Sequence, residues 1–162
     1  MIRFLFIILS AVILLSCGEH KKEAPAENVP VSEHFTWAPS LDDSSGVLKM
    51  TESEPIPDDS LSISYMLNYL NHHLRFQDTT LLHLELVKQS GDTIFVHIPD
   101  PFHLTQSSGS TGAEEYMATM IYNLTEIPGI KYVHFDFEEG DHAQPGLYAR
   151  DSLQQGILPL GD

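Results

Sequence analysis

Residues 113–137 read AEEYMATMIYNLTEIPGIKYVHFDF, and this stretch decides the fold. In its first half apolar side chains recur every three or four residues, the spacing that places them on one face of a helix. That stripe consists of Ala113, Met117, Met120, Ile121 and Leu124. Thr111 and Glu114 have capping-box spacing at the start, and Pro128-Gly129 ends the helix. From residue 130 to 137 apolar and polar side chains alternate, which predicts a strand.

The chain before this stretch contains a second helix and a β-hairpin. A cap at Asp59 or Ser60 precedes a helical apolar stripe made of Ile63, Met66, Leu67, Leu70 and Leu74. Residues 80–87 and 93–98 flank the turn Ser90-Gly91-Asp92 and have the pattern of a hairpin.

Residues 35–37 and 46–50 are predicted to form one or two edge strands. The resulting order is β-α-β-β-α-β. The sequence therefore predicts an α+β fold, with two helices on one face of a small mixed β-sheet.

The N-terminus has the features of a bacterial export signal. Arg3 supplies a positive charge, and residues 4–15 form an apolar stretch too short to span a bilayer comfortably. The string Leu14-Leu15-Ser16-Cys17 resembles the lipobox of bacterial lipoproteins. We therefore expect a signal peptide over residues 1–16, a lipid on Cys17 and a flexible tether over residues 17–33. An ordinary cleaved signal peptide and a retained transmembrane helix are the alternatives.

Composition limits the remaining possibilities. The length of 162 residues suits one domain after the leader and tether are set aside. The formal net charge of −15 disfavours nucleic acid as a partner. Cys17 is the only cysteine, and its lipidation would leave no disulfide, no cysteine metal site and no cysteine nucleophile.

A family resemblance rests on two strings, Thr93-Ile94-Phe95-Val96-His97-Ile98 and the run from Tyr122 through Pro128-Gly129 to Val133. Together they resemble the GerMN domain of sporulation and spore-germination proteins, over residues 34–140. The resemblance implies an extracytoplasmic α/β module that binds or assembles envelope components. It implies no catalysis, because the shared motif is a packing motif.

No catalytic, metal or cofactor site is predicted. The candidate metal ligands His72 and His73 are adjacent, so they diverge around the helix instead of converging on an ion. The loop Ser107–Gly112 precedes a helix but lacks the lysine of a phosphate-binding loop. An envelope hydrolase or metal-binding protein that uses the histidines remains the alternative function.

The segment 141–162 lies outside the family pattern. It contains His142, Tyr148 and Arg150, which we take as candidate partner-binding residues because tyrosine and arginine are favoured at interfaces. In the alternative interpretation, its apolar residues dock on the domain as additional core.

The combined prediction is a lipoprotein of the cell envelope with a binding or scaffolding role. Its partners would be the membrane, through the lipid on Cys17, and an envelope protein or cell-wall component. Gly18 resembles the default signal for outer-membrane sorting in an organism with two membranes.

Overall fold

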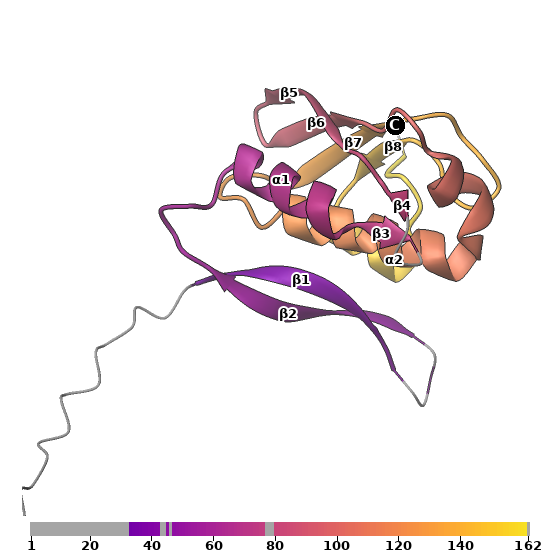
Figure 1. Cartoon of the computed structure of the whole chain (residues 1–162), viewed down its shortest axis with the longest axis horizontal. Coiled ribbons are helices and arrows are strands. Elements are labelled where there is room, and N and C mark those ends of the chain that lie inside the picture. Colours follow the sequence, from indigo (N-terminus) through magenta and orange to yellow (C-terminus); the bar gives the residue numbers. More distant parts are fainter. Residues whose placement is uncertain (1–32, 43–44, 46, 77–79, 162) are drawn as a thin grey trace, which may run out of the picture. The chain divides into compact units, whose positions relative to one another are not determined.

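The main sheet has four strands in the order β5-β6-β7-β8. They are β5 (Glu85–Ser90), β6 (Thr93–His97), β7 (Tyr132–Asp136) and β8 (Gly146–Tyr148). β6 and β7 are parallel and the two outer pairs are antiparallel, so the sheet is mixed. The computed structural model describes residues 33–42, 45, 47–76 and 80–161 (Figure 1).

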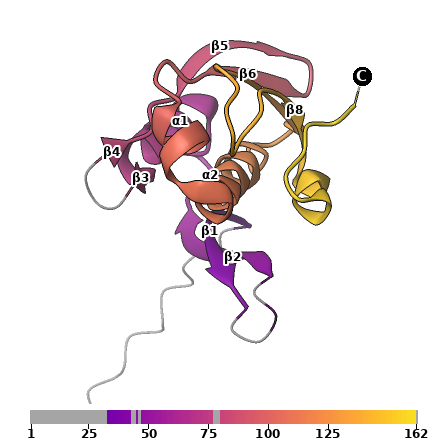
Figure 2. The same cartoon turned by 90° about the vertical axis from the view of Figure 1, so that its right-hand side faces the viewer.

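Two helices lie on the same side of this sheet. They are α1 (Ile63–His73) and α2 (Gly109–Leu124), and they contact each other (Figures 1 and 2). The predicted fold class, α+β with a small mixed sheet and two helices on one face, is confirmed.

The core lies between α2 and the sheet. The predicted stripe of α2 is buried along its whole length, and Ile121 is 1% exposed. The sheet contributes the inward members of its alternating strands, Ile94 and Val96 from β6 and Val133 and Phe135 from β7. The alternation read from residues 130–137 is therefore confirmed, because Val133, Phe135 and Phe137 are buried while Asp136 is exposed.

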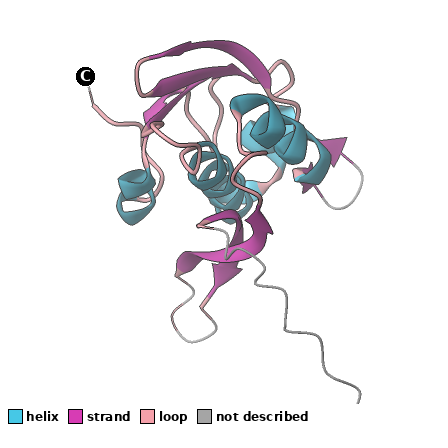
Figure 3. Ribbon diagram, turned by 90° about the vertical axis from the view of Figure 1, so that its left-hand side faces the viewer, coloured by secondary structure: helices cyan, strands magenta, loops and turns pink. Residues whose placement is uncertain are grey.

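The first two strands form a ribbon of their own. β1 (His34–Leu41) pairs antiparallel with β2 (Leu48–Ile56), and neither joins the main sheet. The ribbon contacts α2 and lies apart from the main sheet (Figure 3). The prediction of edge strands was thus right about the strands and wrong about their place, because the backbone of Trp37 in β1 is hydrogen-bonded to a side chain of α2.

Several boundaries differ from the predicted ones. Ser62 caps α1, its Oγ accepting from the backbone N–H of Tyr65 at 3.2 Å, so the helix begins after Asp59 and Ser60. α2 begins at Gly109, one residue after the π-helical turn η1 (His103–Ser107). Thr111 therefore lies inside the first turn of α2 and forms no capping box.

The hairpin also begins later than predicted. Thr80 and Leu81 form the two-residue strand β4, paired with β3 (Arg75–Phe76), and do not belong to the hairpin. One reason is Asn71, whose side chain bonds both the N–H and the carbonyl of Leu84 at 2.7 and 3.0 Å and holds that residue against α1.

The C-terminal segment is built into the domain. β8 is the fourth strand of the sheet, and the 3-10 helix η2 (Arg150–Gln155) lies alongside α2 (Figure 2). Beyond it, the N–H of Leu160 donates to the carbonyl of Leu147 at 2.7 Å, so the end of the chain lies against β8.

Candidate functional site

A pocket of about 210 Å³ lies between the N-terminal half of α2, the loop 140–144 and residues 156–158. Two of the three predicted partner-binding residues, His142 and Tyr148, line it. They come from different elements, and the pocket exists because β8 and the segment after η2 fold back beside α2.

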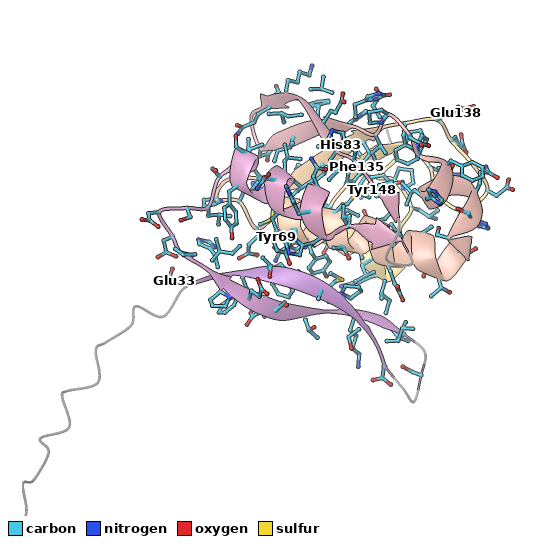
Figure 4. The ribbon with its side chains drawn as sticks, in the orientation of Figure 1. Glu33, Tyr69, His83, Phe135, Glu138 and Tyr148 are labelled. Atoms are coloured by element: carbon cyan, nitrogen blue, oxygen red, sulfur yellow. The ribbon has the colours of Figure 1, made fainter. Side chains whose placement is uncertain are left out.

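The floor of the pocket is apolar. Ala113, Met117 and Tyr148 are each at most 2% exposed. The ring of Tyr148 packs edge-on against Phe135, with 5.8 Å between centroids, in the interior of the domain (Figure 4). Its hydroxyl donates to the carbonyl of Gln144 at 2.5 Å. Burial, together with the charge of Glu139, raises the pKa of Tyr148 well above its usual range, so this side chain is a neutral core group.

The rim of the pocket is polar and carries negative charge. Glu114 and Asp141 contribute carboxylates, and the Oγ of Ser110 lies 3.4 Å from the Nδ1 of His142. The backbone N–H of His142 donates to the carbonyl of Thr105 at 3.1 Å, which fixes the loop against η1. His142 is thus held at the mouth of the pocket by its own backbone.

The remaining wall has an unusual backbone. Gly156 and Ile157 both have positive φ angles, 79° and 54°. A β-branched residue in this region is an outlier that costs about 1–3 kcal/mol. The N–H of Ile157 donates to the carbonyl of Ser152 at 2.8 Å, which holds the strained turn and buries the Ile157 side chain. Strain of this kind concentrates at sites where a side chain must be held in place.

The third predicted residue, Arg150, lies in a separate network. Its guanidinium donates to the carboxylate of Glu126 at 2.6 Å and lies 5.0 Å from the ring centroids of both Trp37 and Tyr122. The indole Nε1 of Trp37 donates to the same carboxylate at 2.8 Å, and the Nδ1 of His34 lies 3.1 Å from its other oxygen. We call Glu126, Arg150, Trp37 and His34 the Glu126 clamp.

The clamp determines the charge state of Glu126. Burial alone would raise the pKa of this carboxyl group. The hydrogen bonds from Arg150, Trp37 and His34 and the positive charge of Arg150 outweigh burial and hold the pKa below its ordinary value of 4.5. Glu126 is therefore an ionised anchor for three donors from distant parts of the chain.

Asn123 completes the attachment of the ribbon. It is fully buried, its Oδ1 accepts from the N–H of Trp37 at 2.9 Å, and its Nδ2 donates to the Trp37 carbonyl at 2.8 Å. The side-chain amide thus pairs with β1 as a neighbouring strand would. It does so at the point where the β1–β2 register shifts between Phe35 and Trp37.

Sequence reasoning missed most of this network. Glu126, Trp37 and Asn123 were not among the predicted site residues. One signal was present in the sequence, since Asn123 lies three residues after Met120, at the edge of the apolar stripe of α2. A buried amide needs partners, which predicts a contact without naming it. Cys17, the predicted lipidation site, lies outside the described residues.

The histidines are used locally. The Nδ1 atoms of His72 and His73 lie 2.7 Å from the carbonyl oxygens four residues earlier on α1. His97 pairs with Asp136 at 3.0 Å, and His134 stacks on Phe95. Within the described part of the chain, no three His, Cys, Asp or Glu side chains are grouped as a metal ion would require. No helix within those residues is both long and apolar enough to cross a membrane.

Comparison with known proteins adds no relative. No protein-family model matches the chain, no curated protein matches it, and no solved structure matches its fold.

Proposed function

We propose that this chain is a lipid-anchored protein of the cell envelope, attached through Cys17, whose domain binds or scaffolds an envelope component without catalysing a reaction. In an organism with two membranes the site of attachment is the outer membrane. The GerMN-like strings in the sequence agree with this role.

The Glu126 clamp is the observation that carries the proposal. The ribbon strand β1 begins at His34, directly after the segment predicted to be the tether. That first residue and Trp37 are bound by Glu126 at the end of α2, and Arg150 adds the C-terminal segment to the same carboxylate. In a domain held to a surface by its N-terminus, these contacts would hold the first strand in place against load on the tether.

Site-specific photo-cross-linking in intact cells tests the binding role. A photoreactive amino acid replaces Leu158, which is 54% exposed at the pocket, or Val87, which is 58% exposed on β5. The two positions are matched in exposure and lie on different elements. We expect a discrete adduct from at least one position in the anchored protein, and its loss in the Cys17→Ser background. Absence of any adduct from both positions contradicts the binding role.

The contact between Ser110 and His142 favours a second candidate function, an envelope hydrolase. Ser110 Oγ would attack a carbonyl carbon and pass its proton to His142 Nδ1. The separation of 3.4 Å exceeds the usual 2.6–3.2 Å, although such contacts can shorten when substrate binds. No hydrogen bond joins His142 to a carboxylate within the described residues.

A fluorophosphonate probe distinguishes the two functions. A hydrolase of this kind would be labelled at Ser110, and the label would disappear in Ser110→Ala. If the probe labels no serine of the chain, the hydrolase function is excluded.

A further inference from the structure

We propose that the pocket beside α2 binds a primary ammonium group carried on a short aliphatic chain. This inference rests on the proposed binding function and names the chemistry that the function would recognise. It follows from the size of the pocket, the sign of its charge and the apolar surface beneath that charge.

The size of the pocket restricts its occupant. Its volume of about 210 Å³ is smaller than the roughly 300–1,000 Å³ of pockets that hold drug-sized ligands. A nucleotide or an oligosaccharide is therefore too large, whereas a single extended side chain or a small amine fits.

The charge of the pocket selects a cation. Glu114 and Asp141 are both at the rim, and no lysine or arginine is among the residues that line the pocket. An ammonium group can satisfy these carboxylates, while a phosphate or carboxylate ligand would be repelled.

The apolar lining of the pocket favours a ligand whose ammonium group is attached to an aliphatic chain. Leu158, which is 54% exposed, presents apolar surface at the pocket, and the lining residues Ala113, Met117 and Ile157 are each at most 9% exposed. A methylene chain would bury its surface against these groups while its ammonium group stays at the rim, as lysine side chains do at protein surfaces.

A lysine side chain on a polypeptide and a free diamine share this chemistry. The experiment uses the full-length chain in detergent micelles, with ¹³C-labelled methionine methyl groups. n-Butylammonium is the probe and 1-butanol is its uncharged counterpart. Met117 lines the pocket, and Met66, buried on α1, is the internal control.

We expect n-butylammonium to shift the Met117 signal and leave Met66 unchanged, with 1-butanol giving much weaker binding. Glu114→Gln and Asp141→Asn should each weaken the binding of n-butylammonium roughly three- to tenfold. Glu52→Gln, which alters an exposed carboxylate on β2, should leave the affinity unchanged. Tighter binding of a capped lysine peptide than of 1,5-diaminopentane identifies a polypeptide as the source, and the reverse order identifies a free diamine.

Three results overturn the inference: no Met117 shift, equal binding of 1-butanol, or unchanged affinity in both pocket variants. If cross-linked adducts still form in cells, such a result removes the ammonium site alone and leaves the binding function intact.

Discussion

Arg150 and Glu126 form a hydrogen-bonded ion pair of 2.6 Å that closes the contact between the C-terminal segment and the end of α2. The carboxylate is only 11% exposed and also accepts from Trp37 of the ribbon. One side chain therefore joins three parts of the chain. The donors bind its negative charge. Substitution of Glu126, or protonation of its carboxylate at low pH, should therefore weaken the contact.

Glu126→Gln should reduce the free energy of unfolding by about 1–2 kcal/mol, because the charge-assisted hydrogen bonds become neutral ones. Denaturant melts at neutral pH measure the change. Glu52→Gln on the exposed face of the ribbon is the control and should have no measurable effect. A loss no larger than that of the control would mean that the clamp contributes nothing to stability.

The same carboxylate should make stability depend on acid. Because the pKa of Glu126 is lower in the folded protein than its ordinary value of 4.5, its contribution is complete above that value. The contribution is lost as the pH falls below 4.5 and through the lower pKa of the folded state. Melts of the parent and Glu126→Gln at a series of pH values, from neutral to well below 4.5, should therefore differ most at neutral pH and converge at the acid end. A constant difference between them would contradict the assignment.

Ile121→Ala should destabilise the domain by roughly 2–5 kcal/mol, because the removed atoms leave a cavity between α2 and the sheet. Thr111→Ala changes an exposed position on the same helix and should alter stability by no more than about 0.5 kcal/mol. Denaturant melts compare the two variants. Equal, small effects would mean that the helix does not bury this face.

Gly140→Ala should disturb the loop that carries His142. A Cβ at this position would lie 2.5 Å from the Cβ of Thr105 and 2.9 Å from its carbonyl oxygen, closer than real atoms approach. Overpacking of this kind costs about 1–3 kcal/mol. Gly161→Ala meets no atom within 4 Å and is the matched control. Thermal melts of both proteins measure the difference. A Gly140→Ala protein as stable as its control would show that η1 shifts to accommodate the added methyl group at little cost in stability.

Cys17→Ser should block lipidation and leave unprocessed precursor. The expected result follows from the lipobox-like string, and cell fractionation with mass spectrometry of the N-terminus measures it. A variant that is processed and sediments with membranes as the parent does would exclude a lipid on Cys17.

Removal of metal should not change stability. The purified full chain is expected to contain no stoichiometric zinc, and a chelator should leave its melting temperature unchanged. A fall of several degrees would make the histidines ligands and favour the metal-binding alternative.

The sequence by itself determined the types of the main elements and which faces they bury. The stripe of α2 and the alternation of β7 follow from local spacing, since a helix or strand repeats its orientation within a few residues. These patterns were enough to predict the α+β class, both helices, the β5–β6 hairpin and β7, but they did not predict β3, β8 or η2. Residue type, and not spacing, brought His142, Tyr148 and Arg150 forward as candidates.

Only the tertiary structure determined which distant parts of the chain these elements contact. Asn123 pairs with Trp37 across 86 residues, and Arg150 reaches Glu126 across 24, yet no periodicity in the sequence links either pair. These long-range contacts placed β1 and β2 on α2 instead of at the sheet edge and separated Arg150 from the pocket. The pairing of β8 with β7 and the contact with Phe135 buried Tyr148. Local pattern is a property of neighbouring residues, whereas a partner is chosen by the geometry of the whole folded chain.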